Sequence, residues 1–125
     1  MTKRLFVYGS LRQGEPNCPR FLGNSVFVRE AVTEDWFKLT GHSYVPYAYP
    51  DPVQGHQLLG EVWEATDEDA AAVERLEVGS GYSPLVTNVY IDGQAQPVTM
   101  YVNDNPFARR AQSDENGCVE WPRRG

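Results

Sequence analysis

The sequence predicts an α+β fold, a small mixed β-barrel or curled sheet with one main helix packed on it. Short runs rich in β-branched and aromatic residues recur along the chain, whereas only one segment carries strong helix signals. The 11 glycines and 9 prolines indicate many turns and short elements. A length of 125 residues fits one ordinary domain, so we expect residues 1–125 to form a single domain that contains its own functional surface.

The first half of the chain is predicted to consist mostly of strands. Leu5–Tyr8 has the pattern of a short buried strand, and a helical turn is predicted at Pro19–Leu22 after the loop that follows. Ser25–Thr33 and Asp35–Leu39 alternate as two further strands. His42–Pro52 is so rich in Tyr and Pro that we expect an irregular wall segment, because such a segment can be neither a helix nor a central strand.

The second half contains the main helix. A strand is predicted at Leu58–Ala65, and Thr66 after it is a suitable N-cap, with acidic residues in the first turn where the helix dipole favours them. The helix is expected to stop before a glycine-rich stretch. Leu85–Asp92 and Gln96–Val102 are predicted to form a hairpin, since the Asp-Gly pair between them is typical of tight turns. We expect the polar tail from about residue 107 to be poorly ordered.

Charge and motif counts narrow the classes of function. Seventeen acidic against 11 basic residues give a net charge of −6, which disfavours binding to nucleic acid or to an anionic membrane. No stretch approaches the ~18 apolar residues of a membrane span, and no signal-peptide pattern is seen, so a cytoplasmic location is expected. Cys18 and Cys118 form no CxxC pair, and His42 and His56 lack the spacing of a metal site.

The first candidate site is the segment Tyr8-Gly9-Ser10-Leu11. A strand that ends in Gly-Ser presents consecutive backbone N–H groups, and glycine lets a ligand approach the chain closely. Such a turn can bind an anion or a carboxylate. An ordinary turn between a strand and a loop has the same residues, so this pattern alone leaves both interpretations open.

The second candidate is Glu77, near the end of the predicted helix. At about 100° per residue, Glu77 falls on the same face as Ala70, Val73 and Leu76, while Glu74 points away. Burial on that face would raise the pKa of the Glu77 carboxyl group toward neutrality, which suits a general base or acid. A frayed helix end that carries Glu77 into solvent is the alternative.

These segments resemble the gamma-glutamyl cyclotransferase-like family. Residues 5–17 are similar to the family's opening signature F-V-Y-G-[ST]-L-[KR]-x-G-x-x-N, and residues 60–63 are similar to its central G-E-[VL]-[YW] strand. The helix that ends in Leu-Glu, with Tyr82 soon after it, fits the same pattern. The resemblance covers about residues 4–105 and implies a small mixed barrel with a cavity at one end.

The resemblance also implies an activity, the cyclisation of a gamma-glutamyl amide or gamma-glutamylamine to 5-oxoproline with release of the free amine. It implies that Glu77 acts as general base and then acid. The residues that would bind the substrate are Tyr8, Gly9, Ser10, Leu11 and Tyr82. The substrate's own α-amine is the nucleophile, so positioning supplies much of the rate and neither metal nor cofactor is implied. The expected partner is the small gamma-glutamyl substrate, and the chain is expected to be a monomer or a homodimer.

Departures from the family pattern keep other functions open. Pro84 stands where the family often has an arginine, and Val78 follows the helix-end glutamate in place of the more usual glycine. One alternative is a non-catalytic module on the same fold that binds a small ligand. The other is a hydrolase of a related amide, which would release glutamate rather than 5-oxoproline.

Overall fold

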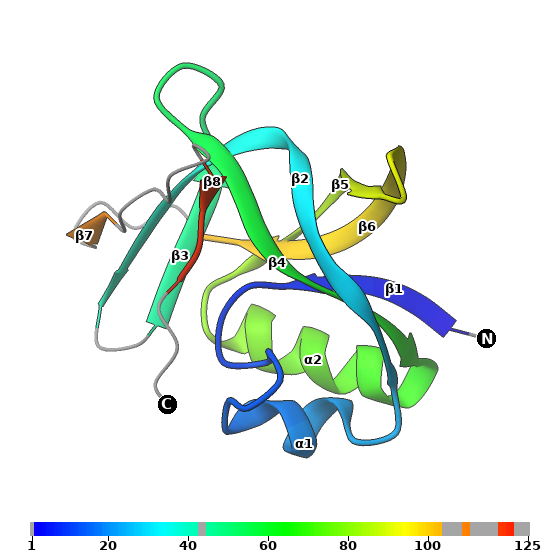
Figure 1. Cartoon of the computed structure of the whole chain (residues 1–125). Helices are drawn as coiled ribbons and strands as arrows, with labels where there is room; N and C mark the ends of the chain where they lie inside the picture. Colours follow the sequence, from blue (N-terminus) through cyan, green and yellow to red (C-terminus); the bar gives the residue numbers. More distant parts are fainter. Residues whose placement is uncertain (1, 43–44, 104–108, 111–117, 122–125) are drawn as a thin grey trace.

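Five strands close into a mixed β-barrel, as the computed structural model shows (Figure 1). Around the barrel, β2 (Val26–His42) pairs with β5 (Ser83–Ile91), followed by β6 (Gln94–Val102), β1 (Thr2–Val7) and β4 (His56–Thr66), which pairs with β2 again. The β1–β6 pair is parallel and the other four are antiparallel. The predicted α+β fold with a mixed barrel is confirmed.

Three strands extend this barrel. β3 (Val45–Pro50) and β7 (Arg109–Arg110) pair with β2, and β8 (Cys118–Val119) runs parallel to β4. The structure describes residues 2–42, 45–103, 109–110 and 118–121. Most of the tail after residue 107 therefore lies outside the described residues, and its predicted lack of order stays a prediction.

Two expectations for the strands are wrong. The two strands predicted between Ser25 and Leu39 are one 17-residue strand, β2, whose register with β4 shifts between Val32 and Trp36 instead of breaking. The segment expected to be irregular contains β3, which is paired with β2 from Val45 to Pro50. Its prolines are tolerated because β3 lies at the end of the strand order, where fewer backbone N–H donors are needed.

Two helices lie side by side at one end of the barrel (Figure 1). α1 (Asn17–Leu22) includes the predicted helical turn, and α2 (Asp67–Gly79) is the predicted main helix. The Thr66 side chain caps α2 as expected, because its hydroxyl oxygen accepts a hydrogen bond of 3.1 Å from the Asp69 N–H. Neither helix, within the described ranges, is long and apolar enough to cross a membrane.

The hairpin prediction is also confirmed. Asp92 and Gly93 connect β5 to β6, with φ of 53° and 79° respectively. Both values lie in the left-handed region that a tight two-residue hairpin turn requires, and the Asp-Gly pair adopts it readily.

β1 separates two hydrophobic clusters and so positions the site. Successive side chains of a strand point to opposite faces. Phe6 belongs to the cluster inside the barrel, while Leu5 and Val7 belong to a second cluster that also contains Val73 of α2. The layer between β1 and α2 is therefore a separate core, and the end of that layer is where a cavity opens.

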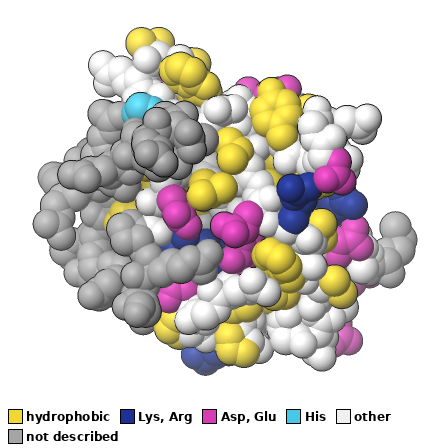
Figure 2. All heavy atoms as spheres, viewed as in Figure 1, with side chains coloured by type: hydrophobic (Ala, Val, Ile, Leu, Met, Phe, Trp, Pro, Cys, Tyr) yellow, Lys and Arg dark blue, Asp and Glu magenta, His cyan; other side chains and the backbone are white. Residues whose placement is uncertain are grey.

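The surface agrees with the acidic balance of the sequence. On the face shown in Figure 2, the basic side chains of the described residues are few, and most of them lie beside acidic ones. Arg4 pairs with Glu64, and Arg29 pairs with Asp92. The described part of this face shows no extended basic patch.

Candidate active site

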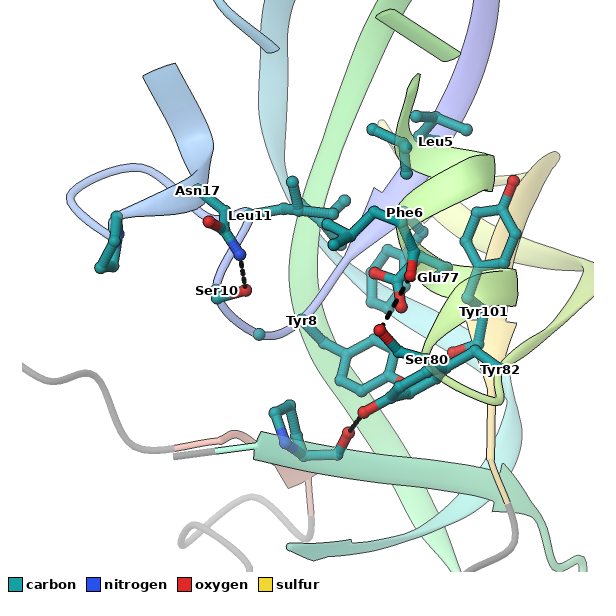
Figure 3. A pocket seen from close by; sticks show the side chains of 16 residues that line it. Leu5, Phe6, Tyr8, Ser10, Leu11, Asn17, Glu77, Ser80, Tyr82 and Tyr101 are labelled. Atoms are coloured by element: carbon teal, nitrogen blue, oxygen red, sulfur yellow. Dashed lines mark hydrogen bonds between the residues drawn. The ribbon is translucent and has the colours of Figure 1, made fainter. Parts of the chain in front are cut away.

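A cavity of about 270 Å³ lies where β1, the loop after it and the C-terminal half of α2 meet (Figure 3). The structure brings all the site residues predicted from the sequence to this cavity: Tyr8, Gly9, Ser10, Leu11, Glu77 and Tyr82. In Figure 3 the Glu77 side chain lies close to the rings of Tyr8 and Tyr82, and Ser10 lies across the cavity beside Asn17.

A tight turn forms one wall of the cavity. The Arg12 N–H donates to the Gly9 carbonyl at 3.1 Å, which places Ser10 and Leu11 at the centre of the turn. The N–H groups of the two central residues take no part in that hydrogen bond. They are therefore available to an anionic group in the cavity, which both residues line.

Contacts with Asn17 and Pro46 fix the position of this turn. Asn17 donates twice to Ser10, from its backbone N–H to the carbonyl at 3.1 Å and from its side-chain amide to the hydroxyl oxygen at 2.9 Å. A Cβ atom added at Gly9 would lie 2.6 Å from Cγ of Pro46. Only glycine lets the turn approach β3 this closely.

Glu77 lies in a closed helical turn and not at a frayed end. α2 continues to Gly79, and the N–H groups of Ser80 and Tyr82 donate to the Glu77 carbonyl at 3.0 and 2.9 Å. Gly81, with φ of 93°, supplies the left-handed residue that such a helix ending needs. The Glu77 side chain is thereby held on the cavity face of α2 with Val73 and Leu76, which also line the cavity.

The Glu77 carboxyl group is in an environment that favours its neutral form. Burial raises its pKa from the ordinary value of 4.5 to about 7. Within the described residues, no side chain or backbone group donates a hydrogen bond to this carboxyl group, so nothing there offsets the loss of hydration. A carboxyl group with a pKa near 7 can accept and return a proton at neutral pH.

Three tyrosines surround Glu77, but their hydroxyl groups donate elsewhere. The Tyr8 hydroxyl donates to the Tyr101 carbonyl, and the Tyr82 hydroxyl donates to the Pro46 carbonyl. Burial raises the pKa of both phenols, and the nearby Glu77 carboxylate raises it further. These two phenols are therefore neutral at physiological pH and form the wall of the cavity.

Tyr101 is the third. Its hydroxyl donates to the Glu74 carboxylate at 3.3 Å, at the edge of the cavity. Burial, followed by the charge of Glu74, raises the pKa of Tyr101 to about 12.

Sequence reasoning did not name Asn17, Pro46 or Tyr101 as site residues. Asn17 carried a usable signal, because it is the last residue of the opening signature. Pro46 lies in the segment that was expected to form a wall, and it lines the cavity as part of strand β3. Tyr101 had no local signal, because it reaches the cavity only through the pairing of β6 with β1.

Pro84, the departure that kept a non-catalytic function open, is next to a cavity residue but is not part of the cavity wall. It is exposed on β5, opposite Tyr101 in the β5–β6 pairing, and it does not line the cavity. Among the residues that the structure describes, no group of three or more His, Cys, Asp or Glu side chains could hold a metal ion.

The sequence of this chain is similar to those of known proteins over most of its length. A family model described as "Gamma-glutamyl cyclotransferase, AIG2-like" matches residues 5–123. A protein from Drosophila melanogaster named "Putative gamma-glutamylcyclotransferase CG2811" is 31% identical over 110 residues, which span 83% of this chain. A protein from Methanocaldococcus jannaschii named "Putative gamma-glutamylcyclotransferase MJ1514" is 32% identical over 73 residues, 58% of this chain. The matched regions span 65% and 59% of these two relatives.

Solved structures share the fold. An AIG2-like protein from Mus musculus superposes with a TM-score of 0.77 at 23% identity, covering 99% of this chain and 98% of that one. An uncharacterised protein from Pyrococcus horikoshii superposes with a TM-score of 0.67 at 27% identity, covering 86% and 84%.

Proposed function

Because this chain belongs to the gamma-glutamyl cyclotransferase, AIG2-like family, we propose that it cyclises a gamma-glutamyl amide to 5-oxoproline and releases the free amine. One observation carries the proposal: Glu77, a carboxyl group whose pKa is raised by burial, shares a cavity with a turn that can bind a carboxylate. The cavity thus combines a group that can move protons with a group that can orient a glutamyl moiety.

The Gly9–Arg12 turn is proposed to hold the glutamyl end of the substrate. The N–H groups of Ser10 and Leu11 can bind the α-carboxylate, and the Ser10 hydroxyl lies beside them with Asn17. The substrate is then fixed with its α-amine and γ-carbonyl in one cavity. Such positioning greatly increases the rate of an intramolecular ring closure, for which effective molarities reach roughly 10⁵–10⁸ M.

Glu77 is proposed to move the protons. The α-amine attacks the γ-carbonyl carbon and forms the ring C–N bond, and the Glu77 carboxylate accepts a proton from that nitrogen. When the original amide C–N bond breaks, the protonated Glu77 gives this proton to the departing nitrogen. The products are 5-oxoproline and the free amine, and Glu77 returns to its starting state. A pKa of about 7 is suited to both transfers.

The lining of the cavity favours particular amines. Among the described residues that line it, none is Lys, Arg or His, and the carboxyl group belongs to Glu77. An amine portion that carries a carboxylate next to the amide would find no cationic partner among these described residues and would lie near Glu77. We therefore expect a gamma-glutamyl group on an uncharged or cationic amine to be preferred over a gamma-glutamyl α-amino acid.

The test is to identify the product. The protein is incubated with gamma-glutamylamines, the ε-lysine isopeptide and gamma-glutamyl amino acids, and 5-oxoproline and glutamate are measured by mass spectrometry. Equimolar 5-oxoproline and amine support the proposal. Glutamate in place of 5-oxoproline identifies a hydrolase, and thermal stabilisation by these compounds without any product identifies a binding module.

A further inference from the structure

Arg12 is fully buried behind the Gly9–Arg12 turn, at 0% exposure, and does not line the cavity. Its Nε donates to the Gly9 carbonyl at 3.2 Å, and its Nη1 donates to the Glu120 carboxylate at 3.2 Å. Nη2 lies 3.9 Å from a carboxylate oxygen of Glu15, which is 5% exposed. A buried guanidinium group needs such charged partners, because its hydration has been lost.

The hydrogen bond from the Arg12 side chain to the Gly9 carbonyl determines how the turn is oriented toward the cavity. The Gly9 carbonyl accepts hydrogen bonds from both the N–H and the Nε of Arg12. In a trans peptide the C=O and N–H point in opposite directions, so the N–H of Ser10, in the same peptide unit, is turned away from Arg12. Arg12 therefore holds the peptide unit whose N–H group is proposed to meet the substrate.

The C-terminal strand brings Glu120 to Arg12. In β8, Cys118 is in register with Gln57, and Val119 is in register with Leu58 of β4. Val119 is 2% exposed, and Trp121 packs against the cluster inside the barrel. Glu120 lies between these two anchored residues, so its carboxylate is held at the back of the turn rather than reaching it from a loose tail.

The next residue of the loop is anchored to the barrel as well. The Gln13 N–H donates to the Glu61 carboxylate at 2.8 Å, and Glu61 is 2% exposed on β4. β4 also carries β8, so the anchor of Gln13 and the strand that positions Glu120 share one barrel strand. The turn is therefore fixed to the barrel from behind through charged groups.

We infer that Arg12 and Glu120 are positioning residues, which orient the Gly9–Arg12 turn for binding of the glutamyl carboxylate. The C-terminal strand β8 is then part of the machinery that forms the binding site. This inference rests on the proposed function for the identity of the ligand, whereas the orientation of the turn can be measured without any turnover.

The experiment compares four proteins, namely the wild type, Glu120→Gln, Arg12→Lys and the control Glu30→Gln. Glu30 is an exposed glutamate on β2, opposite Glu61 in the β2–β4 pairing, so the control makes the same chemical change without altering the Arg12–Glu120 contact or the hydrogen bond from Gln13 to Glu61. Backbone amide signals and amide exchange of residues 9–13 are followed by NMR, with 5-oxoproline as the added probe. Where 5-oxoproline is formed, kcat and KM are measured on the same samples, with thermal unfolding as the check of folding.

Glu120→Gln is expected to weaken 5-oxoproline binding and to raise KM about tenfold, because the hydrogen bond from Arg12 loses its negatively charged acceptor. kcat should change less than KM, and amide exchange at residues 9–13 should be faster than in Glu30→Gln. Arg12→Lys keeps the positive charge but loses the Nε–H group that donates to the Gly9 carbonyl. We therefore expect this variant to bind 5-oxoproline more weakly than Glu120→Gln does.

Binding, KM and amide exchange in Glu120→Gln that match Glu30→Gln would overturn the inference. If the wild type neither binds 5-oxoproline nor forms it, the proposed function fails. Amide exchange then decides the positioning role by itself: faster exchange at residues 9–13 in Glu120→Gln supports it, and exchange equal to that of Glu30→Gln overturns it.

Discussion

Glu61 and Glu77 differ in the surroundings of their carboxyl groups, because Glu61 is 2% exposed whereas Glu77 is half-buried on a cavity wall. Glu61, on β4, accepts hydrogen bonds from the Gln13 N–H at 2.8 Å and the Trp63 indole N–H at 3.1 Å. Glu77, on α2, faces a cavity, and no described residue donates to its carboxyl group. A carboxylate that is satisfied by donors holds its surroundings together, whereas one that is buried without donors is available for proton transfer. The same residue type therefore serves structure at one position and, as proposed, chemistry at the other.

The largest effect is expected at Glu77. Glu77→Gln keeps the shape of the side chain but cannot accept and return a proton, so kcat for 5-oxoproline formation should fall about 10²–10⁴-fold. The melting temperature should not fall, because the variant loses no hydrogen bond that a described residue makes. Steady-state kinetics and thermal unfolding check both parts, with the exposed Glu68→Gln as the matched control. Turnover that survives Glu77→Gln would remove this residue as the base.

The opposite result is expected at Glu61. Glu61→Ala leaves the Gln13 N–H and the Trp63 indole N–H without this acceptor, and should lower the free energy of unfolding by about 2–4 kcal/mol. Urea denaturation measures this loss. Glu77→Ala should cost far less under the same conditions, so equal losses for the two variants would break the contrast between them.

Stability should also depend on pH through Glu77. Its pKa is raised from 4.5 to about 7 in the folded protein, so the folded state binds the proton more tightly than the unfolded state. The stabilisation of the folded state by the protonated Glu77 side chain is fully present below about pH 4.5 and is lost as the pH rises to about 7. Between these limits, the free energy of unfolding of the wild type should fall by on the order of 2–3 kcal/mol relative to Glu77→Gln. A difference in the free energy of unfolding between the wild type and Glu77→Gln that stays constant over this pH range would contradict the prediction. It would show that the Glu77 carboxyl group is hydrated in the folded protein.

The smallest effect is expected at Tyr82. Tyr82→Phe removes the hydroxyl that donates to the Pro46 carbonyl, at a cost of about 1 kcal/mol. The pKa of Glu77 should remain near 7, because burial and not a hydrogen bond raises it. NMR titration of the Glu77 side-chain carbon checks this point. A pKa that returns to 4.5 would show that the tyrosine, rather than burial, sets the environment of Glu77.

Local patterns predicted the parts of the site that local geometry controls. Helical periodicity placed Glu77 on the face of Val73 and Leu76, and the Gly-Ser pair marked the turn after β1. Both depend on residues close together in the sequence, where a period of 3.6 or a glycine has a direct structural meaning.

The remaining parts depend on which strands become neighbours. Tyr101 and Pro46 reach the cavity through β6 and β3, and no local pattern states where those strands pair. Arg12 shows the same limit, because an arginine is usually exposed, and its burial depends on contacts such as those with Gly9, Glu15 and Glu120. Glu120 is far away in the sequence, so its part in the turn could not be read from the opening motif.

The pH dependence of 5-oxoproline formation tests the central claim most directly. The rate kcat/KM is measured from about pH 5 to 9 for the wild type and for the residual activity of Glu77→Gln. If Glu77 is the base, the wild-type profile rises with a midpoint near pH 7, and this limb is absent in the variant. The same limb in both proteins, or a wild-type midpoint near 4.5, would contradict the assignment of Glu77.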